Sequence, residues 1–161
     1  MSAAGFNKIL VAINGSPQSA AGLEKAIQLA APTTTEIHLV AALEPPLITD
    51  AGPVELVKEY QGLETYLTHH LGKARERLES AGFRMRRPPE LCRGSAKANI
   101  VQHAKDLGVD LVVLGGPAHG LWECGLRGCT ACWVVKYSPC SVLVVRAEQT
   151  SAEKTPARGE R

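Results

Sequence analysis

The hydrophobic residues of this chain fall into short continuous runs, separated by segments in which apolar residues recur every three or four positions. The runs lie at 9–13, 37–43, 111–114 and 142–145, and the second is broken only by His38. Uninterrupted apolar runs of this length are typical of strands whose two faces are both covered. They therefore predict the buried strands of a parallel sheet.

Between the runs, helical spacing predicts four helices. The first begins at Ser16-Pro17, which suits an N-cap and a first helical residue, and ends before Pro32. The second and longest carries apolar residues from Leu56 to Leu78 and is closed by Gly82. The other two are a helix between Gly94-Ser95 and Gly108, and a short one around Ala131, Val134 and Val135.

A further strand is predicted just before the Pro88-Pro89 pair. Residues 83–86 alternate apolar and arginine side chains, a pattern of a polar strand at a sheet edge. Leu91-Cys92 can continue this strand beyond the prolines. The chain then alternates five strands with four helices.

This alternation predicts an α/β fold, in which right-handed crossovers build a parallel sheet with helices on both faces. In such sheets ligands bind beyond the carboxyl ends of the strands, where the strand order reverses. The loops that begin at Asn14 and Gly115 are therefore the candidate binding loops. Residues 147–161 show no apolar period and their charges cancel, so we expect one domain over 1–146 and a disordered tail.

Composition narrows the class of protein. The chain has 161 residues, a net charge of +2 and only 4% aromatic residues, so its core must be aliphatic and nucleic acid is an unexpected partner. Its apolar runs are far shorter than the roughly 18 residues of a membrane span. The apolar stretch near the N-terminus is too short for a signal peptide, whose core needs about 7 to 15 residues. With five cysteines, an odd number, we expect a cytoplasmic protein with reduced thiols.

Three segments carry a resemblance to a known family. They are Ile-Leu-Val-Ala-Ile-Asn-Gly-Ser at 9–16, the strand and glycine-containing loop at 111–129, and Tyr-Ser-Pro-Cys-Ser-Val-Leu-Val-Val-Arg at 137–146. Together with the order of elements, residues 6–146 resemble the universal stress protein family. The resemblance implies a three-layer α/β/α domain of the adenine nucleotide α hydrolase type, with strand order 3-2-1-4-5. It also implies a homodimer that pairs through the last strand, Val142 to Val145.

ATP-binding members of that family use a loop of the form G-x2-G-x9-G-[ST], whose glycines and helix N-terminus hold phosphates. Here the frame reads Gly115-x2-Ala118-x9-Gly128-Cys129. Alanine in a left-handed conformation costs about 1 to 2 kcal/mol, and Cys129 replaces a hydroxyl by a weak donor. Asn14 stands where the family has a carboxylate that can hold a divalent ion. Two lost hydrogen bonds to charged groups, about 1.5 to 3 kcal/mol each, would weaken ATP binding by two or more decades.

The resemblance thus implies a stress-response regulator or adaptor with a degenerate adenine-nucleotide pocket, and not an efficient enzyme. A slow ATPase is an alternative, against which Asn14 argues. Equally, the glycines at 115, 116 and 128 can be turn glycines that only carry the chain from strand to helix. The residues that the resemblance places at the pocket are Asn14, Ala42 beside the base, Gly115, Gly116, Ala118, Gly128, Cys129 and Thr130.

The cysteines support a second class of function. Cys124, Cys129 and Cys132 give C-x4-C-x2-C, which with His119 can form a soft-metal site. Cys129 and Cys132 also lie one turn apart at the expected start of a helix, where the dipole lowers a thiol pKa, so a reversible disulfide is a further hypothesis. The alternative to both hypotheses is that these cysteines are inert thiols that pack as small apolar side chains, which is what we expect for Cys140.

Overall fold

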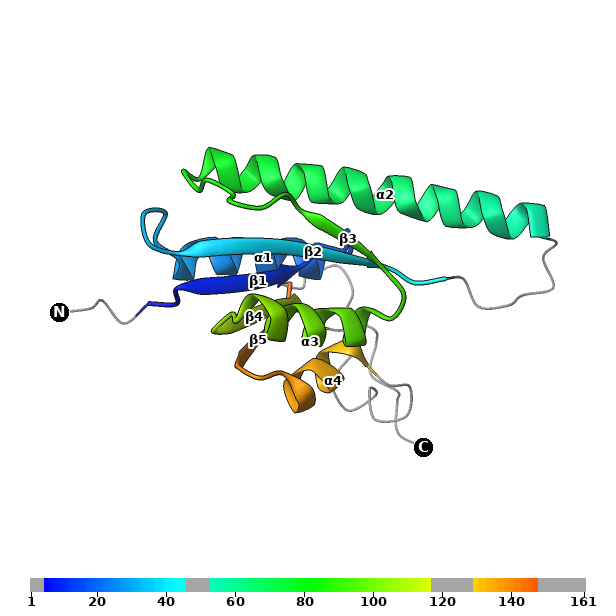
Figure 1. Cartoon of the computed structure of the whole chain (residues 1–161). Helices are drawn as coiled ribbons and strands as arrows, with labels where there is room; N and C mark the ends of the chain where they lie inside the picture. Colours follow the sequence, from blue (N-terminus) through cyan, green and yellow to red (C-terminus); the bar gives the residue numbers. More distant parts are fainter. Residues whose placement is uncertain (1–4, 46–52, 117–128, 148–161) are drawn as a thin grey trace, which may run out of the picture.

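The computed structural model describes residues 5–45, 53–116 and 129–147. Over these ranges strands and helices alternate as predicted (Figure 1). The elements are β1 (Lys8–Ala12), α1 (Pro17–Leu29), β2 (Glu36–Leu43), α2 (Pro53–Ser80), β3 (Glu90–Arg93), α3 (Ala96–Leu107), β4 (Leu111–Gly115), α4 (Thr130–Tyr137) and β5 (Ser141–Val145).

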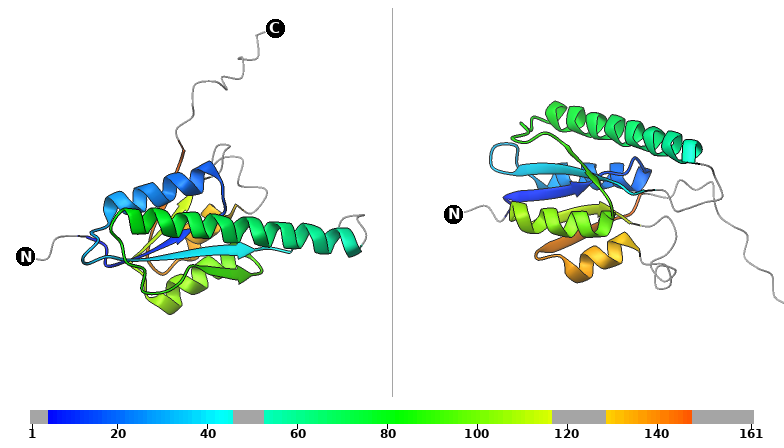
Figure 2. Two further views of the ribbon diagram at one scale, coloured as in Figure 1. Left: turned by 90° about the horizontal axis from the view of Figure 1, so that it is seen from above. Right: turned by 45° about the vertical axis from the view of Figure 1, so that its right-hand side comes forward.

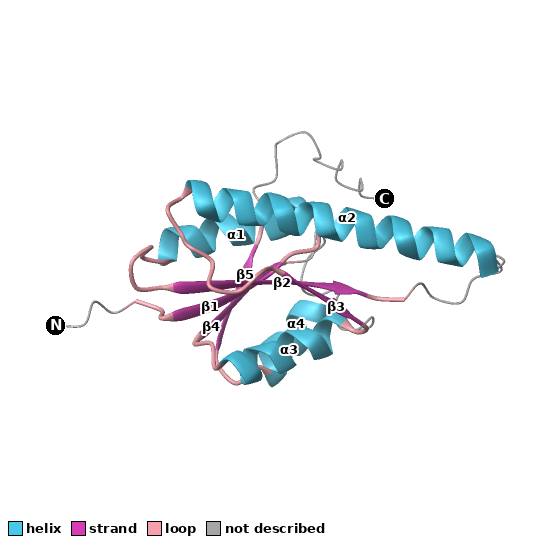
Figure 3. Ribbon diagram, turned by 45° about the horizontal axis from the view of Figure 1, so that its top comes forward, coloured by secondary structure: helices cyan, strands magenta, loops and turns pink. Residues whose placement is uncertain are grey.

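The strands form one parallel sheet in the order β3-β2-β1-β4-β5, which confirms the expected topology. β1 is central, because Ile9 is in register with Ile37 of β2 on one side and with Leu111 of β4 on the other. Helices α1 and α2 lie on one face of the sheet, and α3 and α4 lie on the other (Figure 3). The strand order reverses between β1 and β4, and that is the switch point of the fold.

Alternate residues of β1 supply two separate hydrophobic clusters. Ile9 and Val11 pack under α1 and α2, whereas Leu10 packs with residues of α3 and α4. All three side chains are buried. Because both faces of the strand are covered, its sequence is a continuous apolar run instead of an alternating one.

The prediction of a strand at 83–86 is wrong, and only its predicted continuation at Leu91-Cys92 is confirmed, because β3 lies wholly after the prolines, at Glu90–Arg93. Phe83 follows the turn that closes α2, where its backbone N–H donates to the Leu78 carbonyl at 3.0 Å and its ring is buried in the core. The two prolines have no N–H to give to a ladder, so strand pairing begins beyond them. The expected edge position is confirmed, because β3 pairs with β2 alone.

Helix α2 has 28 residues and extends well past the sheet (Figures 1 and 2). Its second half is buried on the sheet from Leu67 to Leu78, whereas Val54 and Val57 in its first turns are more than half exposed. The apolar period predicted the helix correctly but not how much of it the sheet covers. None of the described helices, α2 included, has the length and hydropathy that crossing a membrane requires.

Candidate functional site

A cavity of about 120 Å³ lies at the switch point, where β1, β2 and β4 end. Its wall includes Asn14, Ala42, Gly115 and Thr130, four of the residues that the sequence analysis places at a pocket. The remaining lining residues are Ala12, Ile13, Ser19, Val40, Ala41, Ala96, Ile100 and Leu114.

The N-terminal turns of three helices meet at this cavity. Thr130 is the first residue of α4 and Ala96 the first of α3, while Ser19 lies in the first turn of α1. Each helix N-terminus carries a partial positive charge, so their convergence favours an anionic ligand. The α3 terminus already has a carboxylate partner, since the Ala96 N–H donates to Glu44 Oε1 at 2.6 Å. The cap of α1 is a neutral group, the Ser16 hydroxyl, and α4 has no acidic residue in its first turn, so these two termini are the better candidates for an incoming anion.

Asn14 shapes the turn that leads from β1 into α1. Its Oδ1 accepts hydrogen bonds from the Ser16 N–H at 3.0 Å and from the Ser16 hydroxyl at 2.6 Å. The Ser16 hydroxyl oxygen in turn accepts from the Ser19 N–H at 3.1 Å, the N-cap contact that starts the helix. One side-chain oxygen at position 14 is thus sufficient to hold this turn, and a carboxylate would leave a second oxygen for a cation.

The turn also contacts α2, which the sequence analysis did not foresee. Gly15 has a φ of +80°, a conformation that favours glycine, and its carbonyl accepts a hydrogen bond from the Tyr66 hydroxyl at 3.2 Å. A side chain at Gly15 would collide with the Tyr66 ring. Tyr66 could not be found from sequence because it lies 51 residues away and on the less buried half of α2.

Gly115 has a packing role that the sequence did not predict, since it was interpreted there as a phosphate-loop glycine or a turn glycine. A Cβ atom on Gly115 would lie 2.6 Å from both Gln18 C and Ser19 N, so the end of β4 packs directly on the backbone of α1. Gly116 continues the sheet, because its N–H donates to the Val145 carbonyl at 2.7 Å. Gly115 is therefore required for the approach of a helix, whatever else binds nearby.

The cysteine-rich segment is described only in part. Cys129 is half-buried at the N-cap of α4 and packs against the second hydrophobic cluster, and Cys132 is exposed one turn later. Cys140 is half-buried in the same cluster, as expected. The soft-metal, disulfide and nucleotide-loop hypotheses stay predictions here. Ala118, His119, Cys124 and Gly128 lie outside the described residues.

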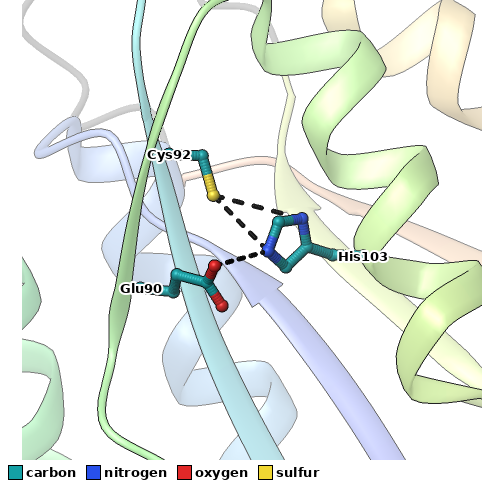
Figure 4. A group of neighbouring side chains, drawn as sticks. All are labelled: Glu90, Cys92 and His103. Atoms are coloured by element: carbon teal, nitrogen blue, oxygen red, sulfur yellow. Dashed lines mark hydrogen bonds and ion pairs between the residues drawn. The ribbon is translucent and has the colours of Figure 1, made fainter.

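A second group of chemically active side chains lies away from the cavity. Glu90 and Cys92 on β3 meet His103 on α3, with their ligand-type atoms all within 4.8 Å of one another (Figure 4). Burial, and then the nearby Glu90 carboxylate, raise the pKa of the Cys92 thiol. The sequence analysis missed this group because it placed the strand at 83–86. With β3 at its true position, the Glu-x-Cys spacing would have indicated two side chains on one face.

Comparison with known proteins agrees with the fold. The model of the universal stress protein family matches residues 5–146. The universal stress protein YxiE of Bacillus subtilis (strain 168) is 28% identical over 155 residues, which cover 88% of this chain and 99% of that protein.

Solved structures with this fold include two with bound nucleotides. A universal stress protein in complex with cAMP has a TM-score of 0.65 and 20% identity, and the match covers 90% of this chain and 100% of that protein. A universal stress protein family protein of Arabidopsis thaliana with AMP bound also has a TM-score of 0.65 and 20% identity. That match covers 94% of this chain and 96% of the plant protein. With the family model matched over nearly all of the described residues, this chain belongs to the universal stress protein family.

Proposed function

We propose that this protein binds an adenine nucleotide at the switch-point cavity and acts as a cytoplasmic stress-response regulator. The observation that carries the proposal is the convergence of three helix N-termini on one cavity at the carboxyl ends of the central strands. The cAMP and AMP in two structures of the same fold support the choice of an adenine nucleotide.

The cavity suggests how such a nucleotide would be oriented. At about 120 Å³ it is smaller than the roughly 300 to 1,000 Å³ of most ligand pockets, so its described walls suit one part of the ligand. The wall beside Ala42 is apolar and fits the base, whereas the termini of α1 and α4 favour the phosphates. The base would then lie toward β2 and the phosphates toward β4.

We further propose that nucleotide binding here serves regulation and not catalysis. None of the described residues that line the cavity has a titratable side chain, so none of them can act as a general acid or base. Asn14 also offers no carboxylate for a divalent ion. The nucleotide would act as a bound signal, with affinity lowered by Asn14, Ala118 and Cys129.

We propose in addition that β5 pairs with the β5 strand of a second copy. β5 is at the edge of the sheet, and its residues Val142 to Val145 are only half-buried within one chain. An apolar edge of this kind presents unpaired backbone groups to a partner. Light scattering of the full chain at micromolar concentration should give the mass of a dimer, and a monomer throughout would contradict the pairing.

The nucleotide proposal is tested by calorimetric titration of the full chain with ATP, AMP and cAMP in the presence of Mg²⁺. We expect one site per chain at which the three nucleotides compete, with a Kd for ATP weaker than about 1 μM because of the altered loop. GTP serves as the control for the base, and it should bind more weakly than ATP. Absence of ATP binding at about 1 mM would contradict the proposal.

A further inference from the structure

Glu90, Cys92 and His103 come together because of strand periodicity and helix packing. Residues two apart on a strand point to the same face, so Glu90 and Cys92 both face the side of the sheet that α3 covers. His103 projects from α3 toward them (Figure 4). Cys92 is buried, the His103 side chain is 18% exposed and the Glu90 side chain is 63% exposed. The group therefore reaches from the core to solvent.

The contact of Nδ1 fixes the tautomer of His103. Its Nδ1 lies 2.8 Å from the carbonyl oxygen of Asn99, and since a carbonyl can only accept, Nδ1 carries a hydrogen and donates it. In the neutral ring, Nε2 then presents a lone pair. Nε2 lies 3.2 Å from Glu90 Oε1 and 3.4 Å from Cys92 Sγ, and Sγ is also 4.0 Å from Nδ1, so the sulfur lies beside the ring. An imidazole nitrogen, a carboxylate oxygen and a sulfur thus lie within 4.8 Å of one another.

Two of the separations between these atoms match those around a small metal ion. A tetrahedral zinc has bonds of about 2.3 Å to sulfur and about 2.0 to 2.1 Å to nitrogen or oxygen, which separates sulfur from nitrogen by about 3.5 Å and nitrogen from oxygen by about 3.3 Å. The two measured separations, 3.4 and 3.2 Å, agree with these values. The Nδ1 hydrogen bond to a backbone carbonyl is also one of the outer contacts that orient metal-binding histidines.

We propose that Glu90, Cys92 and His103 bind one divalent transition-metal ion of the zinc class. The mixed sulfur, nitrogen and oxygen donors suit zinc or cobalt and do not suit magnesium or calcium, which prefer oxygen alone. Binding converts the Cys92 thiol to a thiolate and releases its proton to solvent. Three protein ligands would leave a fourth coordination position for water or a small ligand, and the exposed Glu90 side chain connects the group with solvent.

The site is separate from the nucleotide cavity, because none of its three residues lines that cavity. It is also separate from the soft-metal hypothesis that rests on Cys124, Cys129 and Cys132. Its test therefore needs no nucleotide, and its failure leaves the proposed function untouched.

Titration of the reduced full chain with Co²⁺, followed by absorption, tests the site. We expect one equivalent to bind, with a near-ultraviolet charge-transfer band from thiolate to Co²⁺, and Zn²⁺ to displace it. His103→Gln and Glu90→Gln, which change half-buried and exposed side chains, should weaken binding by more than the roughly 10 to 100-fold that loss of an outer partner costs. Cys92→Ser should abolish the thiolate band.

The matched control is a triple variant, Cys124→Ser, Cys129→Ser and Cys132→Ser, which should keep the band and the affinity. A band that survives in Cys92→Ser but disappears in the triple variant would overturn the proposal and favour the other cysteines. Absence of any thiolate band in the wild-type chain would overturn it as well, and would leave His103 and Glu90 as a simple ion pair. If Cys92→Ser fails to fold, unchanged affinity in both His103→Gln and Glu90→Gln is the contradicting result.

Discussion

Gly115→Ala should destabilise the protein although it adds a single methyl group. The new Cβ would lie 2.6 Å from two backbone atoms of α1, Gln18 C and Ser19 N, which cannot rotate away as a side chain would. Overpacking of a core typically costs about 1 to 3 kcal/mol, and the rigid obstacle favours the upper part of that range. Reduced freedom of the unfolded chain returns about 0.4 to 1 kcal/mol, so we expect a net loss of about 1 to 2 kcal/mol.

Urea denaturation followed by circular dichroism measures this loss. With a slope of about 1 to 3 kcal/mol per molar urea, the midpoint should fall by roughly 1 M. The control is Gly72→Ala, because Gly72 is an exposed residue of α2 and a Cβ there meets no atom within 4 Å. That variant should be as stable as the wild type or up to about 1 kcal/mol more stable. A Gly115→Ala variant with an unchanged midpoint would refute the packing role of this glycine.

Three further substitutions test the turn, the loop and the core. Asn14→Asp should strengthen ATP binding only when Mg²⁺ is present, because one oxygen keeps the turn and the other can hold the ion; calorimetry with and without Mg²⁺ measures this. Cys129→Ser should raise ATP affinity by about tenfold or more by restoring a hydroxyl donor, and equal Kd values would argue against a phosphate near this position. Burial lowers the pKa of His38 from its ordinary 6.5, so near this pH the unfolded chain binds a proton at His38 that the folded chain does not. The free energy of unfolding should therefore fall as the pH drops through about 6.5. His38→Gln should flatten this pH dependence in denaturation experiments, and an unchanged slope would contradict the assignment. The charged groups around His38 are Glu36 at 3.2 Å, which favours the protonated form, and Arg87 and Lys8, which oppose it.

The sequence predicted those features that depend on local periodicity. The continuous runs at 9–13 and 111–114 indicated strands with two covered faces, and the structure confirms both, with β1 and β4 adjacent at the switch point. The third strand was misplaced because the alternation at 83–86 is also what a loop produces when Phe83 packs into the core. Periodicity reports which side chains are buried, and it does not report which backbone groups pair.

The parts of the site that could not be predicted depend on contacts between distant segments. Gly115 resembles a phosphate-loop glycine in sequence, and its contact with α1 becomes visible only when β4 is placed beside that helix. Cys92 and His103 lie 11 residues apart on a strand and a helix, a spacing that has no local signature. Cys92 and His103 meet because of the register of β3 in the sheet and the face that α3 turns toward the sheet. Both depend on the packing of the whole sheet.

The most direct test of nucleotide binding at the switch point is calorimetric titration of ATP into a matched pair of α3 variants. Ala96→Leu adds three carbon atoms at a half-buried position that lines the cavity, and Ala98→Leu adds the same atoms two residues later at an exposed position away from it. If ATP occupies the cavity, Ala96→Leu should lose at least about tenfold in affinity, equivalent to about 1.4 kcal/mol, while Ala98→Leu binds as the wild type does. Equal ATP affinity in the wild type and both variants would contradict the account.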